Sequence, residues 1–329
     1  MRRYDETTFD AHLKRIAQRR RRQSMDLYPA VSEIITAVID GGDQALKTYS
    51  QRFDGIVPDA LQVPLSQLKW AYETSEMAFQ QALTLAIENI TTFHTPQLLS
   101  DYTLTQEGVQ MGQIIRPIQR VGIYVPGGEA AYPSTLLMNV IPAQLAGVGS
   151  IAVFTPPQSD AEKLKPILAA AYAVGVTEIY LVGGVQAIAA MAYGTETVKS
   201  VDKITGPGNQ YVTAAKKLVF GDVGIDMIAG PSEVMIVSDG RQNPEYIVAD
   251  LLAQMEHDGE AMALVVTLSA QEADAIELAL LNQLNALEKP GIAQRAYEEN
   301  TYVCTCADLE QAMTWVNLVA PEHLELLTD

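Results

Sequence analysis

Residues 121–230 alternate between short apolar runs and helical stretches, and this alternation restricts the folds open to the chain more than any other feature. The apolar runs predict strands at 121–125, 151–154, 179–182 and 201–205, and the stretches after them predict helices at 134–148, 160–174, 184–194 and 210–219. Strands that alternate with helices form parallel βαβ units. We therefore expect a parallel sheet whose ligand lies at the carboxyl ends of the strands, where the Gly-rich loops fall.

The flanking segments complete the predicted architecture. Residues 26 to about 115 look helical, with an amphipathic stripe from Val31 to Ile39 that Gly41-Gly42 interrupts. Strands are expected again at 234–237, 263–266 and 302–304, with helices between them. The predicted fold class is α/β, with two Rossmann-like parallel-sheet domains, one inserted in the other, and an N-terminal helical arm.

The expected domain boundaries follow from these three stretches. Residues 1–25 form the arm, and residues 26–120 plus 231–329 form the first α/β domain, which carries the metal and acid/base residues. Residues 121–230 form the inserted nucleotide-binding domain. We expect the site in the cleft between the two domains, which is a common location for ligands.

Charge excludes a general nucleic-acid binder. The formal net charge is −18 and the pI is about 4.6, whereas phosphate recognition needs a basic surface. Residues 1–22 are the exception, with eight basic and three acidic residues. This arm could bind nucleic acid, but packing on the acidic surface of its own or a partner subunit is favoured.

The same composition predicts a soluble, cytoplasmic protein. No apolar run reaches the length of a membrane span, and the N-terminus has no secretory-type apolar segment. Cys304 and Cys306 are too few for a disulfide framework. They lie in a β-type run, so buried structural thiols are favoured over the nucleophile of an aldehyde-dehydrogenase-like mechanism.

Spacing alone gives weak signals of chemistry. None of the Gly-rich loops matches G-x-G-x-x-G. Gln254 and His257 share a helix face, but an amide and one imidazole are a poor zinc motif, and a helix-capping histidine is the alternative. Pro321 fits a first helical position, which would put Glu322 and His323 in a first turn. They are either an acid/base pair or an exposed helix start, because histidine exchanges protons near pH 7.

Several long motifs together resemble the histidinol dehydrogenase family. They are Val121-Gly-Ile-Tyr-Val-Pro-Gly-Gly-Glu-Ala, Gly183-Gly-Val-Gln-Ala-Ile-Ala-Ala-Met-Ala-Tyr-Gly-Thr, Val201-Asp-Lys-Ile-Thr-Gly-Pro-Gly-Asn, Asp226-Met-Ile-Ala-Gly-Pro-Ser-Glu-Val, Gln254-Met-Glu-His and Ala320-Pro-Glu-His-Leu-Glu, with Arg52-Phe-Asp-Gly as a further match. The resemblance covers nearly the whole chain.

The resemblance implies an NAD-dependent, zinc-dependent homodimer that oxidises L-histidinol through L-histidinaldehyde to L-histidine, the last step of histidine biosynthesis. It assigns the NAD contacts to Tyr124, Gln186 and Asn209. It assigns substrate contacts to Ser232, Gln254, His257 and His323, of which Gln254 and His257 are also zinc ligands. Glu322 and His323 correspond to the acid/base pair.

The sequence departs from the family pattern after its Pro-Glu-His segment. The family continues there with an Asp zinc ligand and an Asn-His-x-Leu-Pro segment that carries a further His ligand and a substrate-binding Glu. The 329 residues contain none of these. We therefore expect a C-terminally truncated member with a half-built metal site. The alternative function is a catalytically inactive fragment that retains the nucleotide-binding fold.

Overall fold

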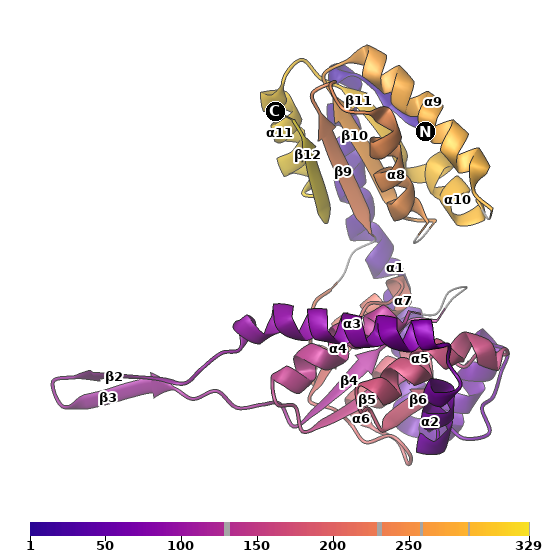
Figure 1. The fold of residues 1–329 in the computed structure, drawn as a ribbon, viewed down its shortest axis with the longest axis vertical. Coiled ribbons are helices and arrows are strands. Elements are labelled where there is room, and N and C mark those ends of the chain that lie inside the picture. Colours follow the sequence, from indigo (N-terminus) through magenta and orange to yellow (C-terminus); the bar gives the residue numbers. More distant parts are fainter. Residues whose placement is uncertain (128–131, 229–231, 257–258, 289, 329) are drawn as a thin grey trace. The chain divides into compact units, whose positions relative to one another are not determined.

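The computed structural model describes residues 1–127, 132–228, 232–256, 259–288 and 290–328, and it divides the chain into two compact units. Unit 1 comprises Met1–Met25 and Gly230–Asp329, and unit 2 comprises Asp26–Ala229. Unit 2 is thus one continuous segment between two parts of unit 1 (Figure 1). No helix in the described part of the chain has both the length and the apolar character that crossing a membrane requires.

Unit 2 is built on a parallel sheet with the strand order β6-β5-β4-β7-β8. The strands are β4 (Arg120–Tyr124), β5 (Ser150–Thr155), β6 (Glu178–Leu181), β7 (Lys203–Thr205) and β8 (Gly224–Ile225). The chain starts at the central strand β4, adds β5 and β6 on one side, and then returns to add β7 and β8 on the other. The order therefore reverses between β4 and β7, the position at which open α/β sheets bind ligands.

Helices cover both faces of this sheet, as the continuous apolar strands require. One face packs against α2 (Leu65–Glu73), α3 (Met77–His94), α4 (Pro133–Leu145) and α5 (Ala161–Ala173). The other face packs against the second part of α1 (Glu6–Phe53), α6 (Gly184–Tyr193) and α7 (Gln210–Val219). Neighbouring residues of one strand, such as Val153 and Phe154 of β5, lie in different core clusters because strand side chains alternate between faces.

The helical prediction for residues 26 to about 115 is correct up to residue 94 and wrong after it. Helix α1 is kinked at Gly42, which has a φ of 50°, where the sequence predicted an interruption. The 3₁₀ turn η1 (Thr95–Gln97) is followed by an antiparallel hairpin of β2 (Tyr102–Gln106) and β3 (Val109–Gln113). The hairpin extends away from the rest of unit 2 (Figure 1). Glu107-Gly108 makes its two-residue turn, with both φ angles positive.

Unit 1 is a second parallel sheet, with the order β1-β11-β10-β9-β12. Its strands are β1 (Arg2–Tyr4), β9 (Glu233–Ser238), β10 (Met262–Thr267), β11 (Thr301–Thr305) and β12 (His323–Leu327). Its helices besides the start of α1 are α8 (Pro244–Met255), α9 (Ala270–Ala286), α10 (Gly291–Asn300) and α11 (Leu309–Val319). The prediction of two parallel-sheet α/β folds is confirmed.

The division into units differs from the predicted domains. Residues 26–120 belong with the 121–229 sheet and not with residues 231–329, because α2 packs on α5 and α3 packs on α4. The N-terminal arm also begins with a strand, since β1 pairs in parallel with β11. The side chains of residues 13–25 lie outside the described part of the structure, so the contact role of the basic arm stays a prediction.

Candidate functional site

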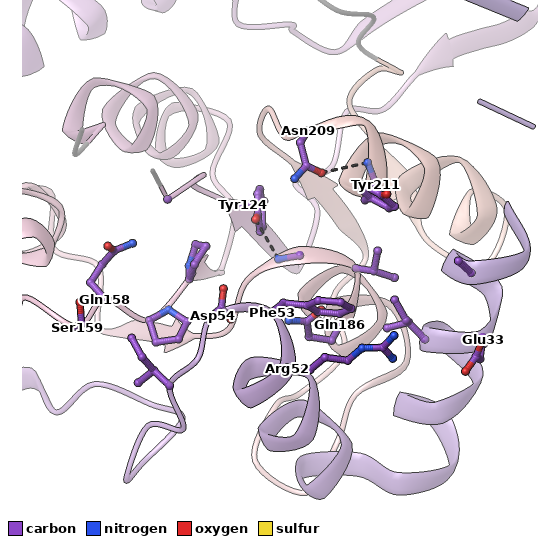
Figure 2. A pocket seen from close by; sticks show the side chains of 18 residues that line it. Glu33, Arg52, Phe53, Asp54, Tyr124, Gln158, Ser159, Gln186, Asn209 and Tyr211 are labelled. Carbon is purple, nitrogen blue, oxygen red and sulfur yellow. Dashed lines mark hydrogen bonds between the residues drawn. The ribbon is translucent and has the colours of Figure 1, made fainter. Parts of the chain in front are cut away.

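A cavity of about 750 Å³ opens in unit 2 beside the carboxyl ends of its strands (Figure 2). Tyr124 ends β4, Gln186 lies in the first turn of α6 after β6, and Asn209 precedes α7 after β7. All three side chains line the cavity. The structure therefore brings together the three residues that the resemblance assigns to the cofactor, next to the point where the strand order reverses.

Tyr124 and Gln186 are fixed by burial. The Tyr124 hydroxyl oxygen accepts a hydrogen bond from the Gly184 backbone N–H at 3.0 Å, at the start of α6. Burial raises the pKa of Tyr124 to about 12, helped by the charge of Asp54, while the Gly184 hydrogen bond opposes the shift. Gln186 is only 1% exposed, and its Oε1 has no hydrogen-bond partner among the described residues. Tyr124 is thus a neutral donor, and the Gln186 oxygen is an unused acceptor.

Asn209 caps helix α7. Its Oδ1 accepts from the backbone N–H groups of Tyr211 at 3.0 Å and Val212 at 3.1 Å. Asparagine is a preferred N-cap because it satisfies the donors that a helix start leaves open. The bonded oxygen orients the side chain and leaves the amide nitrogen as the group that can donate to a ligand (Figure 2).

The loop that carries Asn209 is held by an ion pair between the buried Lys216 and Asp226. Lys216 of α7 donates to the Gly206 carbonyl oxygen at 3.0 Å and contacts the Asp226 carboxylate. The Gly206 N–H donates to the second Asp226 oxygen at 2.8 Å. Gly206 has a φ of 110°, and a Cβ at this position would lie 2.1 Å from the Tyr124 carbonyl oxygen. Glycine is therefore required here, and it lets the Gly206-Pro207-Gly208 loop approach β4.

Unit 1 brings a second group of predicted residues together. His323 begins β12 and Gln254 lies near the C-terminus of α8; the His323 Nδ1 is 3.1 Å from the Gln254 Oε1. Ser232 immediately precedes β9, and Val234, the second residue of β9, is the strand partner of His323. These three residues lie at the amino ends of the strands, because α8 runs back along the sheet. This is the opposite end from the one that the cavity of unit 2 uses.

The predicted helix start at Pro321 is wrong. Ala320 has a φ of 47° and ends α11, after which the chain enters strand β12 beside β9. The pairing of His323–Leu327 with β9 outweighs the local helix signal. Glu322 is an exposed bend residue immediately before the strand. The angular separation expected for helical neighbours therefore does not apply to Glu322 and His323.

Glu325 is a site neighbour that sequence reasoning missed. It lies two residues after His323 on the same strand face, and burial with the charge and hydrogen bond of Asp250 raises its pKa. Asp250 is one turn before Gln254 on α8. The alternation of β12 could have found Glu325 only if the segment had been recognised as a strand.

The described residues do not form a zinc site. His257, one of the two ligands that the resemblance implies, lies outside them. No group of three or more His, Cys, Asp or Glu side chains in the described part could hold a metal. Zinc sites in proteins use three or four such ligands, and Gln254 is a neutral amide. We therefore derive no chemical step through zinc.

The two cysteines are structural. The Cys304 and Cys306 thiols are buried beside Trp315 and Val316 in one core cluster. Burial, with a smaller contribution from Cys306, raises the pKa of the Cys304 thiol. A catalytic thiol needs an accessible thiolate, so the buried structural interpretation is confirmed.

Comparisons with known proteins agree with the sequence motifs. Residues 17–329 match the family described as histidinol dehydrogenase. A histidinol dehydrogenase of Streptococcus mutans is 49% identical over 310 residues, covering 94% of this chain and 72% of the relative. The enzyme of Syntrophotalea carbinolica is 45% identical over 329 residues, with 99% and 76% covered. The crystal structure of histidinol dehydrogenase from Elizabethkingia anophelis has a TM-score of 0.84 at 38% identity, covering 91% of this chain and 70% of that chain.

Proposed function

The chain belongs to the histidinol dehydrogenase family, and from this membership we propose that it oxidises L-histidinol to L-histidine through L-histidinaldehyde with two NAD⁺. This is the last step of histidine biosynthesis. The contact between His323 and Gln254 carries the proposal, because it prepares a base for the proton that an alcohol loses when it is oxidised.

The Gln254 amide sets the state of the imidazole. With its Oε1 accepting, the His323 Nδ1 carries a proton and Nε2 keeps a lone pair. Nε2 is then the atom that takes the substrate hydroxyl proton. Gln254 is 7% exposed, so its packing in α8 holds the imidazole in one orientation. Gln254 is therefore a positioning residue for the proton transfer.

The second oxidation needs a water molecule, since an aldehyde must be hydrated before it can lose another hydride. Glu322 is the carboxylate next to His323, and its exposure lets water reach it. We assign Glu322 the removal of a proton from that water. Ser232 is assigned a substrate contact, because it lies at the same end of the sheet as His323.

NAD⁺, when bound, supplies the hydride acceptor for both steps. The cavity of unit 2 suits a dinucleotide in the chemistry of its lining. It presents the Tyr124 hydroxyl and the Asn209 amide as donors and a buried, unpartnered Gln186 oxygen as an acceptor. The hydrogen bond of Tyr124 to the start of α6 keeps this helix N-terminus, which favours anions, at the cavity.

Family membership is the only support for the proposal that the chain uses zinc and is located in the cytoplasm. The two zinc ligands that membership implies are Gln254 and His257.

The proposal of a homodimer is supported by the structure of the β2–β3 hairpin. All ten strand residues of the β2–β3 hairpin are exposed, and a two-stranded hairpin is marginally stable alone. Tyr102, Leu104, Val109 and Met111 share one face, which a second copy of the chain would cover.

The function is tested by NADH formation from L-histidinol in the purified chain, with His323→Asn and Glu322→Gln variants. His323→Asn should lower kcat for the alcohol by about 10²–10⁴-fold, the usual contribution of a general base, and leave NAD⁺ affinity unchanged. Glu322→Gln should slow oxidation of supplied L-histidinaldehyde more than oxidation of the alcohol.

His94→Asn is the matched histidine control, since His94 hydrogen-bonds Gln97 and packs edge-on against the Phe93 ring at the end of α3, outside both groups of residues. Absence of histidinol-dependent NADH in the wild-type chain, with zinc added, contradicts the proposed function. Equal turnover of His323→Asn and wild type contradicts the role of His323.

A further inference from the structure

Asp54 follows the last residue of α1, and its side chain lines the cavity between Gln158 and Tyr124 (Figure 2). Its backbone N–H continues the helix by donating to the Ser50 carbonyl oxygen at 2.8 Å. The Asp54 side chain makes no such hydrogen bond within the helix. Its Oδ2 is buried and has no hydrogen-bond partner among the described residues.

The negative charge of this carboxylate is unfavourable in the folded chain. Burial raises the pKa of Asp54 to about 6, so ionisation is unfavourable in the folded chain. The residue also lies at a helix C-terminus, where the backbone carbonyls already concentrate negative charge. The cation next to it in sequence, Arg52, lies over the Phe53 ring at 5.3 Å, and no ion pair in the described part joins it to Asp54. No described residue supplies a donor to this buried acceptor, which leaves it open to a donor on a bound ligand.

The neighbouring groups indicate what that donor is. Tyr124 lies close enough for the charge of Asp54 to raise its pKa, and the Tyr124 hydroxyl can still donate because it uses its oxygen to accept from Gly184. Gln186 adds a second buried oxygen without a partner. Acceptors beside a donor complement hydroxyl groups, which both donate and accept. A phosphate would instead meet the Asp54 carboxylate, and like charges at short range repel.

We propose that Asp54 selects NAD⁺ over NADP⁺ by accepting a hydrogen bond from a ribose hydroxyl of the bound dinucleotide. The inference rests on the proposed function, because it requires that the cavity of unit 2 holds the cofactor. It adds a specificity residue that is separate from Tyr124, Gln186 and Asn209. The selection comes from a carboxylate that accepts from the hydroxyl and repels a phosphate on the same ribose.

The test measures the dissociation constants of NAD⁺ and NADP⁺ by isothermal titration calorimetry on the whole chain at pH 8, without substrate. Asp54→Asn should weaken NAD⁺ binding by about tenfold, because it replaces a charged acceptor with a neutral one. The ratio of NAD⁺ to NADP⁺ affinity should fall by more than this factor, since the repulsion of the phosphate also disappears. Asp59→Asn is the matched control: it removes an exposed carboxylate five residues along and should leave both constants unchanged.

Thermal melting of the same proteins separates a cofactor role from a structural one. Asp54→Asn should melt at or above the wild-type temperature, and Asp54→Ser, which keeps a small neutral acceptor, should repeat the loss of selectivity. Unchanged NAD⁺ affinity in both variants overturns the inference, as does equal weakening of NAD⁺ and NADP⁺. Failure of the wild-type chain to bind NAD⁺ overturns the proposed function of the cavity instead.

Discussion

At the scale of the residue, burial sets the charge of the groups around the cavity. Tyr124 stays protonated at neutral pH because burial raises its pKa to about 12. Asp54, in the same cavity, has a pKa of about 6 for the same reason. The Tyr124 hydroxyl is therefore a neutral hydrogen-bond donor, whereas the ionised Asp54 carboxylate lowers the stability of the folded chain.

The raised pKa of Asp54 predicts that the stability of the folded chain depends on pH. Its pKa is raised from 3.8 to about 6 on folding, so between these values the folded chain binds a proton that the unfolded chain has lost. The contribution of Asp54 to stability therefore falls as pH rises from about 4 to about 6 and is constant above that. Asp54→Asn should be more stable than wild type at pH 8, and the difference should shrink at pH 4.

Urea unfolding of both proteins across this range measures the difference, with Asp59→Asn as a control that should follow wild type at every pH. A lower stability of Asp54→Asn than of wild type at pH 8 would show that the carboxylate stabilises the fold and would contradict the prediction.

At the scale of the element, the loop between β7 and α7 depends on one buried side chain. Lys216, which is 3% exposed, holds both Gly206 and Asp226. Lys216→Met should lower the free energy of unfolding by about 2 kcal/mol, because it removes charged hydrogen bonds and leaves Asp226 without its cation. It should also weaken NAD⁺ binding, since the loop that positions Asn209 loses its anchor.

Lys217→Met is the control for this prediction. Lys217 is the exposed neighbour on the same helix, and its Nζ lies 5.3 Å from the centroid of the Tyr28 ring. Chemical denaturation and NAD⁺ titration measure both effects. Equal stability of the two variants would show that Lys216 does not anchor the loop.

The elements also show which parts of the fold the sequence can predict. The strands and helices of 121–219 agree with prediction to within about three residues, because each apolar run and each Gly-rich loop is a local signal. Strands β1 and β12 were missed because they exist only through distant partners, β11 and β9. At Pro321 a local helix signal is present, and pairing with β9 outweighs it.

The residues of the candidate site also differ in how far the sequence could predict them. Tyr124 lies near the end of a predicted strand, and Gln186 and Asn209 follow predicted strands, so motifs and topology both indicate them. The 3.1 Å contact of His323 with Gln254 could not be predicted, since it joins two elements far apart in sequence. Asp54 lies in the Arg52-Phe-Asp-Gly motif, but its missing hydrogen-bond partner is visible only once the chain has folded around it.

At the scale of the molecule, the β2–β3 hairpin predicts self-association. Its apolar face carries Tyr102, Leu104, Val109 and Met111, each 51–57% exposed, while Thr103, Thr105 and Gln110 lie on the opposite face. Leu104→Lys with Met111→Lys should convert a dimer to a monomer, because covering this face would then bury two charges.

Thr103→Lys with Thr105→Lys is the matched control on the polar face and should leave the dimer intact. Sedimentation velocity measures the mass of each protein. A monomeric wild-type chain, or equal dissociation of both double variants, would contradict the assignment of the hairpin to the subunit contact.

The order of the units along the chain has a consequence for biosynthesis. Unit 2 is one continuous segment, Asp26–Ala229, so all of its strands have left the ribosome while most of unit 1 is still untranslated. Unit 1 must wait, because β1 at its N-terminus pairs only with β11, and β9 lies between β10 and β12. Since domains fold as units during synthesis, the cavity of unit 2 forms first, and the nascent N-terminal strand stays unpaired until residues 301–305 emerge.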